Sequence, residues 1–416
     1  LKSSGLRWHE KCASILRDMG FFPSKAEPDI WMRKVDGIYE YIGSYVDDLE
    51  IASTNPTAIL SVFTDKFHLK LKGPGPITYH LGCDYWRDKH DILCMSPKKY
   101  IEKMVDTYVR LFGIQPKQYT SPLEKGDHPE LDTSEELDLE GLKKYQSLIG
   151  AMQWAVTIGR IDITTAVMTM SGFRTNPRQG HLDRCKRIYG YLSKMRHSVI
   201  RFRTEEPDYS HLPDFEYDWE HSVYAGAKEL EPVDAPEPLG KRVITSTFED
   251  ANLLHDMITG RSVTGILHLV NKTPIDWFSK KQNTVETSTY GSEFVAARIA
   301  TEQIMDLRIT LRYLGVPIGK SYMFGDNRSV VDSSTIPQSK LNKRHTALSF
   351  HRVREAIAAK VLYFYFVSGE SNPADMLSKH WGYQQIWPAL RAILFWEGLD
   401  MDLLDQSKNS ETIPEE

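Results

Sequence analysis

The chain has 416 residues, of which 41% are hydrophobic and 26% are charged, and its formal net charge is -5 at pH 7. This composition is typical of a globular protein with two or three domains, and the charge gives no support for general nucleic-acid binding. The four cysteines form no Cys-x-x-Cys pair and no apolar run approaches the roughly 18 residues that span a bilayer, so neither a zinc site, nor a disulfide framework, nor a membrane segment is expected.

The first predicted element is a helix over residues 8–19, where apolar side chains recur at helical spacing and Gly20 provides the cap. Short runs rich in β-branched and aromatic residues follow at 38–42 and 49–52, and such runs are typical of paired strands. We expect the helix to pack against this hairpin. A second helix, over residues 57–67, is expected on the same sheet.

Asp47 and Asp48 lie at the predicted tip of this hairpin. Two adjacent carboxylates repel each other unless a cation joins them, and a hard divalent ion such as Mg2+ prefers oxygen ligands. In nucleotidyl transfer, such acids hold the metal ions that stabilise the attacking and leaving oxygens. The alternative is an ordinary solvated turn, because acids are common in turns.

A second hairpin is predicted from residues 77–86 and 92–95. Gly82 within it either has a functional role or only relieves crowding in the strand. A helix then opens with Ser96 as its cap and Pro97 in its first turn.

Further helices are predicted over residues 145–154, 162–173 and 181–197. The last of these, with the residues just after it, carries seven basic side chains against one acid, Asp183. This excess predicts a positive stripe suited to phosphates, and the alternative is a solvated helix face. The basic residues are Arg184, Lys186, Arg187, Lys194, Arg196, Arg201 and Arg203.

The composition changes at residues 204–240, which are rich in acids, contain five prolines and include a single lysine, Lys228. Such a segment buries little apolar surface, so we predict an exposed linker. Residues 401–416 are predicted to form a polar tail.

Strands and helices alternate after the linker. A three-stranded meander is followed by helix, strand, helix and strand, the order expected of a mixed-sheet ribonuclease H domain. The predicted strands are 243–248, 263–270, 274–279, 321–324 and 361–367, and the predicted helices are 289–314 and 350–360.

Four acids occupy the ends of these elements. Asp250 ends the first strand, Glu293 lies in the first turns of the long helix, Asp326 ends the fourth strand and Asp375 begins a terminal helix. Each acid alone is better explained as a turn residue or a helix-surface charge, so their joint order is the specific signal. If folding gathers them, two Mg2+ ions about 4 Å apart, or Mn2+ in their place, would neutralise their repulsion and activate water against a phosphodiester.

Several motifs resemble those of copia-type retrotransposon Pol polyproteins. Tyr-Val-Asp-Asp between apolar strands is similar to the polymerase motif of reverse transcriptases, and similar segments recur over nearly the whole chain. The similar segments are 1–8, 24–29, 45–48, 79–82, 248–252, 261–265, 277–282, 287–294, 325–327, 343–345, 351–355 and 372–379.

The resemblance implies a multidomain fold of classes α/β and α+β: part of a reverse-transcriptase palm, a helical thumb and connection, and a ribonuclease H-like mixed-sheet domain. The implied divisions are palm at 1–95, thumb and connection at 96–203, linker at 204–240, ribonuclease H domain at 241–400 and tail at 401–416. The chain is then expected to be part of a longer Pol polyprotein, cytoplasmic or in virus-like particles, and without a membrane segment.

The resemblance also implies roles for individual residues. Catalysis and metal binding would fall to Asp47 and Asp48 in the polymerase half, and to Asp250, Glu293, Asp326 and Asp375 in the nuclease half. The template-primer would contact Tyr45, Leu81 and Gly82, the last two at the primer grip. The RNA–DNA hybrid would contact Arg184, Lys186, Arg187, Lys340, Lys343, Arg344, His345, Arg352 and Arg354.

The sequence departs from the family pattern in two places. Asn252 stands where the family has an acid, and residues 368–372 lack the histidine that some ribonucleases H carry before their last aspartate. His345 or His351 could replace that histidine. A further palm aspartate is expected before the segment that matches residue 1, so we expect that these residues alone cannot extend a primer.

Two other readings remain open at this point. One is a nucleic-acid-binding remnant without catalytic activity, and the other is an unrelated two-metal phosphoesterase. If the chain is part of a copia-type Pol polyprotein, its expected partners are an RNA–DNA hybrid, a template-primer and the rest of the Pol polyprotein.

Overall fold

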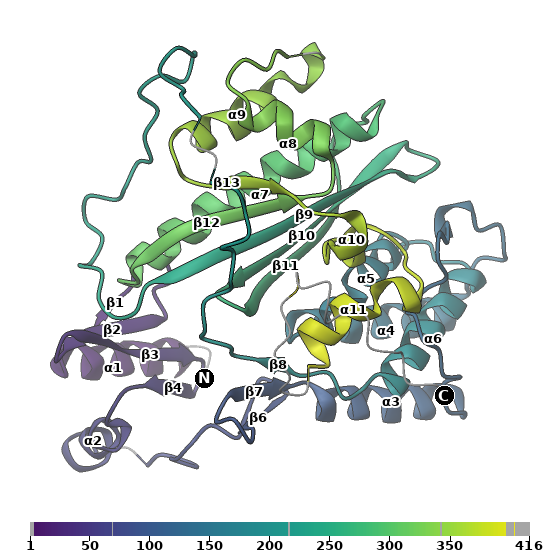
Figure 1. The fold of residues 1–416 in the computed structure, drawn as a ribbon. Helices are drawn as coiled ribbons and strands as arrows, with labels where there is room; N and C mark the ends of the chain where they lie inside the picture. The colour runs from purple at the N-terminus through teal and green to yellow at the C-terminus, as the bar shows by residue number, and fades with distance from the viewer. Residues whose placement is uncertain (1–3, 69, 215–216, 342, 397–402, 404–416) are drawn as a thin grey trace. The chain divides into compact units, whose positions relative to one another are not determined.

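The computed structural model describes residues 4–68, 70–214, 217–341, 343–396 and 403. It is a mixed α/β structure with three β-sheets (Figure 1). In the described part of the chain, no helix is long and apolar enough to cross a membrane. Residues group into two compact units: the first comprises Leu1–Ile77, Leu230–Val243 and Met305–Gly319, and the second comprises Thr78–Glu229, Ile244–Ile304 and Lys320–Glu416.

The first unit contains a four-stranded antiparallel sheet in the order β1-β2-β3-β4. The predicted hairpin is confirmed, because Ile42 pairs with Ile51 across β3 and β4. The predicted helix is confirmed as well, and its buried Cys12 and Leu16 pack in one core with Ile42. The elements are α1 (Ser4–Asp18), β1 (Phe22–Pro23), β2 (Ile30–Val35), β3 (Ile38–Tyr45), β4 (Asp48–Ala52), α2 (Pro56–Ser61) and a π-helical turn (Val62–Lys66).

The second unit begins with a small antiparallel sheet in the order β5-β6-β7-β8, followed by helices. The helix predicted to be capped by Ser96 begins at Lys98, and Pro97 occupies the cap position. Ser96 Oγ donates to the carbonyl of Ser198, 2.8 Å away, and accepts from the backbone nitrogen of Lys98 over 3.3 Å. The elements are β5 (Tyr79–His80), β6 (Cys83–Arg87), β7 (Leu93–Ser96), β8 (Ile200–Arg201), α3 (Lys98–Phe112), α4 (Leu139–Thr157), α5 (Thr164–Ser171) and α6 (Gln179–Lys194).

A five-stranded sheet in the order β11-β10-β9-β12-β13 forms the centre of the second unit. β9, β10 and β11 are antiparallel, whereas β12 and β13 are parallel. The strands are β9 (Val243–Asp256), β10 (Arg261–Val270), β11 (Thr273–Lys281), β12 (Ile318–Gly325) and β13 (Tyr363–Phe366). The helices are α7 (Thr289–Tyr313), α8 (Arg328–Thr335), α9 (Ala347–Ala358), α10 (Asp375–Ser378) and α11 (Tyr383–Leu394).

The first strand of this sheet is longer than predicted, so the prediction that Asp250 ends it is wrong. Ala251 and Asn252 continue the ladder by pairing with Thr264 and Val263 of β10. Because backbone pairing does not depend on side-chain polarity, the acid interrupts the apolar pattern without ending the strand. Asp250 therefore lies within a sheet rather than in a turn.

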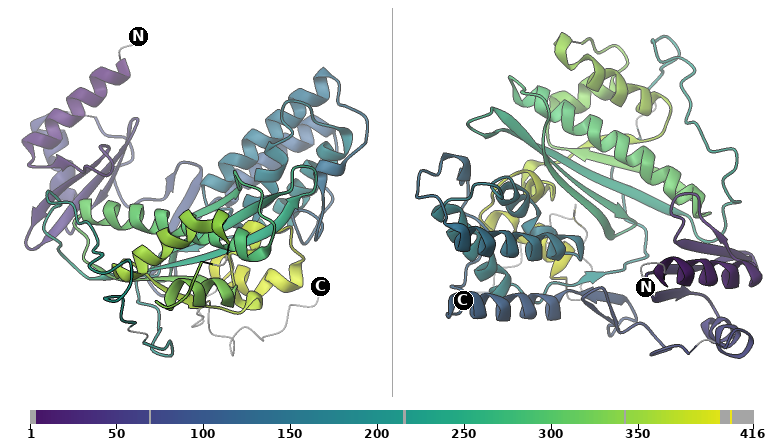
Figure 2. Two further views of the ribbon diagram at one scale, coloured as in Figure 1. Left: turned by 90° about the horizontal axis from the view of Figure 1, so that it is seen from above. Right: turned by 180° about the vertical axis from the view of Figure 1, so that it is seen from behind.

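Helices cover both faces of the sheet, as Figures 1 and 2 show from three directions. On one face, His268 Nε2 lies 3.0 Å from Gln303 Oε1 of α7. On the other face, a Cβ added at Gly265 of β10 would lie 2.7 Å from the backbone nitrogen of Ser378, so α10 packs directly on the strand. One hydrophobic core joins this face to α4, α5 and α6, and the helical region and the sheet thus form one unit.

The segment predicted as an exposed linker has packing contacts that its composition does not reveal. Tyr209 packs against Phe324 with ring centroids 5.3 Å apart, and its hydroxyl donates to Ser246 Oγ over 2.9 Å. Trp219 and Tyr224 both pack against the Arg354 guanidinium. Most other residues of the segment are exposed. The tail predicted at 401–416 lies outside the described residues, except for residue 403.

Two buried histidines lie where the end of β9 meets the chain after α10. The rings of His255 and His380 are 4.8 Å apart, and His380 Nε2 has no hydrogen-bond partner among the described residues. Burial lowers the pKa of His255 to about 4 and the pKa of His380 to about 3. Both rings are therefore neutral in the folded protein at neutral pH.

We expect this histidine pair to make the fold sensitive to acid. A histidine with a lowered pKa stabilises the fold fully above its unfolded pKa near 6.5, and this contribution is lost as the pH falls toward the folded value. Between pH 6.5 and pH 5, His380 alone should account for a loss of about 2 kcal/mol. Urea unfolding of the wild type and His380→Gln at both pH values measures this, and a difference between the two proteins that does not change with pH would contradict it.

Candidate metal centre

Three of the predicted acids meet in the second unit. One carboxylate oxygen from each of Asp250, Asp326 and Asp375 lies within 4.8 Å of the others, in a group that could hold a metal ion. Asp250 comes from the middle of β9, Asp326 follows the neighbouring β12, and Asp375 is the first residue of α10. Two adjacent strands, and a helix packed on the neighbouring β10, therefore bring together acids that are far apart in the sequence.

The loop before α10 is tied to β9, which fixes the position of Asp375. Asn372 Nδ2 donates to the carbonyl of Glu249 over 2.9 Å, and Asn372 Oδ1 accepts from the backbone nitrogen of Ala374 over 3.1 Å. Thr165 of α5 donates to the carbonyl of Met376 over 2.8 Å from the other side. The short helix is thus held at both of its surfaces.

Glu293, the fourth predicted acid, is buried near this group in the second turn of α7. Burial, followed by the charges of Asp250, Glu249 and Asp326, raises the pKa of Glu293 well above its ordinary value. Its Oε2 has no hydrogen-bond partner among the described residues. The group of three within 4.8 Å does not include it.

Glu249 is a fifth acid of the site that sequence reasoning missed. It pairs with Ile266 while Asp250 pairs with Gly265, so the two neighbouring acids point to opposite faces of the sheet. Glu249 Oε1 lies close to Gly325, because a Cβ added at Gly325 would be 2.3 Å from it. Glu249 Oε2 has no hydrogen-bond partner among the described residues. Burial and the charges of Asp250 and Asp326 raise the pKa of Glu249 well above its ordinary value. A glutamate inside an apolar strand was the available signal.

Two residues after Met376 and Leu377 also belong to the site and were not predicted. Ser378 Oγ donates to Asp250 Oδ2 in a short hydrogen bond. Lys379 Nζ lies 2.6 Å from Asp375 Oδ1 and 3.2 Å from Asp250 Oδ1. Burial lowers the pKa of Lys379, but attraction to Asp250 and Asp375 outweighs burial and raises it.

The electrostatics show an excess of negative charge. Burial and the charge of Asp250 raise the pKa of Asp326 to about 7 and the pKa of Asp375 to about 6, although Lys379 opposes both shifts. Four carboxyl groups, those of Asp250, Glu293, Asp326 and Asp375, thus share one ammonium group. Carboxylate oxygens, two of them buried without partners, are the ligands that hard divalent cations prefer, so these residues fit a divalent metal ion.

The basic residues predicted to bind the hybrid have different environments. Lys343 donates to Ser288 Oγ, His345 Nε2 lies 3.2 Å from Glu286 Oε2, and Arg352 lies 3.2 Å from Glu355 Oε2. Arg344 is exposed at the start of a short 3-10 turn, and Lys340 is exposed as well.

The prediction that Arg354 contacts the hybrid is wrong. Its side chain is buried, its two terminal nitrogens donate to the carbonyls of Ser333, Ile336 and Pro337, and aromatic rings pack on its guanidinium. Arg354 follows Phe350 by one helical turn, so it shares the buried face of α9, whereas Arg352 does not.

The positive stripe predicted on α6 is largely neutralised. Arg184 forms a bidentate pair with Asp127 and a further contact with Asp132, at 2.7 to 2.9 Å. Lys186 pairs with Asp183, and Arg187 pairs with Glu124. Three of these acids come from a loop more than 50 residues earlier, so counting charges along the helix could not reveal them.

In the polymerase-like segment, Asp47 and Asp48 are exposed at the hairpin turn of the first unit. Trp8 Nε1 of α1 donates to the carbonyl of Val46 over 2.9 Å and so supports the turn. Tyr45, which pairs with Asp48, is half exposed.

Leu81 and Gly82 form the turn between β5 and β6 in the second unit. Both residues have positive φ, 50° and 94°, which is the left-handed region that favours glycine. A Cβ at Gly82 would lie 3.6 Å from the side chains of Trp154 and Tyr100. The glycine thus serves the turn and its packing against the helices.

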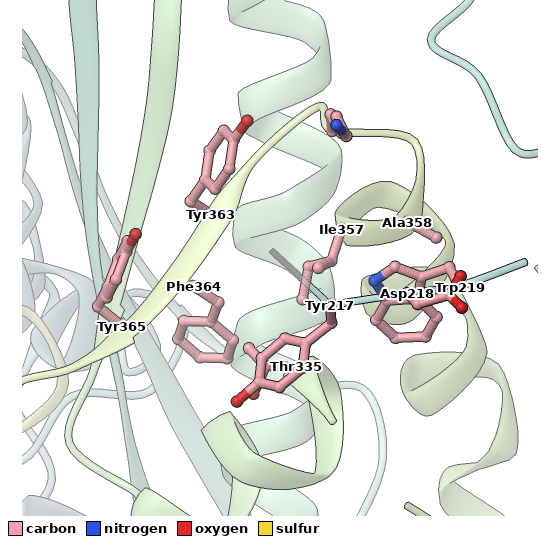
Figure 3. A pocket seen from close by; sticks show the side chains of 10 residues that line it. Tyr217, Asp218, Trp219, Thr335, Ile357, Ala358, Tyr363, Phe364 and Tyr365 are labelled. Atoms are coloured by element: carbon pink, nitrogen blue, oxygen red, sulfur yellow. The ribbon is translucent and has the colours of Figure 1, made fainter. Parts of the chain in front are cut away.

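A separate cavity of about 270 Å³ lies among α8, the end of α9, β13 and residues 217–219 (Figure 3). Aromatic side chains dominate its lining, among them Trp219, Tyr363 and Phe364. None of the predicted site residues lines it.

Known proteins resemble this chain over most of its length. It is 24% identical over 388 residues to the retrovirus-related Pol polyprotein from transposon TNT 1-94 of Nicotiana tabacum, and 23% identical over 383 residues to the one from transposon RE1 of Arabidopsis thaliana. Each match covers 91% of this chain. This chain is related to retrotransposon Pol polyproteins. It spans about a quarter of the length of these two relatives, 26% and 23%.

A shorter relative of this Pol-related chain is the transposon Ty5-1 protein of Saccharomyces cerevisiae, which is 23% identical over 314 residues and matches over 74% of this chain and 86% of its own length. No protein-family model matches the chain. Among solved structures, the N-terminal RNase H domain of a Mycobacterium tuberculosis protein has 12% identity and a TM-score of 0.26, over 36% of this chain and 96% of that one. LC11-RNase H1 in complex with RNA/DNA hybrid has 17% identity and a TM-score of 0.26, over 33% and 93%.

Proposed function

We propose that the second unit carries a metal-dependent ribonuclease H that hydrolyses the RNA strand of RNA–DNA hybrids, as part of a copia-type retrotransposon Pol polyprotein. The observation that carries this proposal is the meeting of Asp250, Asp326 and Asp375 beside the buried Glu293. The sheet supports it, because three antiparallel strands followed by two parallel ones are the order expected of that fold.

The rest of the chain is proposed to belong to a reverse transcriptase. The first sheet with its Asp47–Asp48 turn would be part of the palm, with its boundary near residue 95, and the helices up to residue 203 would form the thumb and connection. Residues 204–240 would then link these parts to the nuclease at 241–400. Asp47 and Asp48 would bind metal together with a further palm acid of the Pol polyprotein.

The nuclease residues have separable tasks. Asp250, Asp326, Asp375 and Glu293 would hold Mg2+, or Mn2+ in its place, and Asn372 keeps Asp375 against β9. When bound, the cations would neutralise charge on the phosphodiester and promote deprotonation of the attacking water. Lys343, Arg344, His345 and Arg352 would contact phosphates of the hybrid, and Tyr45, Leu81 and Gly82 the template-primer.

Substrate selectivity tests this proposal. With Mg2+, the purified chain should cut the RNA strand of a labelled RNA–DNA hybrid and leave single-stranded RNA, duplex RNA and duplex DNA of the same sequence intact. Hydrolysis of a small phosphodiester such as bis(p-nitrophenyl) phosphate, with the hybrid intact, would instead indicate an unrelated phosphoesterase. Hybrid binding without cleavage would indicate a non-catalytic remnant.

A further inference from the structure

Lys379 occupies the position between two carboxylates that a bridging cation would take. Its Nζ lies 2.6 Å from Asp375 Oδ1 and 3.2 Å from Asp250 Oδ1, and both acids belong to the group that could hold a metal ion. An ammonium group at these distances neutralises part of their mutual repulsion. The group of acids thus contains a cation of its own.

The backbone at Lys379 is fixed, whereas its side chain has room to move. The backbone nitrogen donates to the carbonyl of Asp375 over 3.0 Å, and the preceding Ser378 is bonded to Asp250. Gly265 lets α10 lie directly on β10. The Lys379 side chain is nevertheless 37% exposed, so its flexible four-carbon stem can carry the ammonium toward solvent without moving Asp375.

A divalent cation and the ammonium group compete for the same oxygens. If Asp250 and Asp375 hold a divalent metal ion, the ammonium would lie close to a double positive charge. Like charges at about 4 Å repel by several kcal/mol even at an effective dielectric constant near 20. The arrangement with both cations in place is therefore unfavourable.

We propose that Lys379 is a resident counter-ion, which holds Asp250 and Asp375 together before metal binds and swings outward when a divalent cation takes its place. This inference rests on the proposed metal centre and adds that a residue outside the ligand set limits its metal affinity. The opposite role would be a fixed support, in which Lys379 stays on Asp375 and orients it for the metal. The two roles predict opposite effects of removing the ammonium.

Mn2+ binding measured by electron paramagnetic resonance separates the two roles without any hybrid present. Lys379→Met should bind Mn2+ about tenfold more tightly than the wild type, because the competing charge is gone. Lys379→Arg keeps a cation and should stay near the wild-type affinity. Lys280→Met removes an exposed lysine of β11 and should change nothing. Equal or weaker binding by Lys379→Met would overturn the proposal.

A second measurement uses the wild-type protein, so it does not depend on the variant folding. Acetylation of Lys379 by a water-soluble ester, followed by mass spectrometry, should become faster when Mn2+ is added, while acetylation of Lys280 stays constant. A rate of Lys379 acetylation that does not change when Mn2+ is added would overturn the proposal. If Lys379→Met binds Mn2+ more tightly but the wild type does not cleave the hybrid, the nuclease proposal is rejected and the counter-ion proposal stands. If the wild type cleaves the hybrid but both proteins bind Mn2+ equally, the counter-ion proposal is rejected and the nuclease proposal stands.

Discussion

Asp326→Asn should abolish hybrid cleavage and, at the same time, make the metal-free protein more stable. Loss of one ligand from a metal site should lower the cleavage rate by about 10^3-fold or more. The pKa of Asp326 is raised to about 7, so its contribution to stability is present below the unfolded pKa near 4 and is lost as the pH rises through 7. Asparagine carries no charge, so at pH 8 the free energy of unfolding of Asp326→Asn should exceed that of the wild type by about 1–3 kcal/mol. The pKa shift alone would give a larger gain, but water screens the partly exposed carboxyl.

Opposite signs of the two effects exclude misfolding as the cause of lost activity. Single-turnover cleavage with Mg2+ measures the first effect, and urea unfolding in EDTA at pH 8 measures the second. Asp276→Asn is the matched control, because Asp276 is an exposed acid on β11 of the same sheet. A variant that is both inactive and less stable than the wild type would show that Asp326 serves the fold rather than a metal ion.

Asp162→Ala should be the most destabilising single substitution considered for the helical region. Arg160 is fully buried, and its Nε and Nη2 donate to the two oxygens of Asp162 over 2.9 and 2.6 Å. Tyr191 also donates to Asp162 over 2.6 Å. Removing the acid leaves a buried guanidinium and a hydroxyl without their acceptor, which should lower the free energy of unfolding by about 3–5 kcal/mol.

Urea unfolding at pH 7.5 measures this loss. Asp183→Ala is the control, because Asp183 is exposed on α6 and pairs with Lys186 and Gln179 at the surface, where such a pair contributes about 0–1 kcal/mol. Equal losses for both variants would contradict the assignment of a buried ion pair.

Sequence order was sufficient to predict that Asp250, Asp326 and Asp375 meet in the second unit. Asp250, Asp326 and Asp375 each mark the edge of an apolar element or stand beside one, and the alternation of strands and helices predicts that these edges converge. Their roles in metal binding and catalysis stay predictions. The exact extent of β9 was not predictable in this way, because pairing with β10 continues past the acid.

The remaining features of the site depend on three-dimensional neighbours. Glu249 adjoins Asp250 in sequence, but only the register with β10 shows that its side chain points to the other face of the sheet, where it lies close to Gly325. Lys379 lies one turn after Asp375, yet its contact with Asp250 requires α10 to pack on the sheet. The charge pattern of its helix predicts that Arg184 binds phosphate, but in the fold Arg184 pairs with Asp127 and Asp132 of a loop that is distant in sequence.

The central claim is that the acids of the second unit form a metal centre that cuts RNA in a hybrid. The most direct test is the rate of RNA-strand cleavage in a labelled RNA–DNA hybrid as Mg2+ is increased from zero, for the wild type and Asp375→Asn. We predict cleavage by the wild type that is absent in EDTA, rises with Mg2+ to a plateau, and is lost in the variant. A folded wild-type protein that binds the hybrid but does not cut it at any Mg2+ or Mn2+ concentration would contradict the claim.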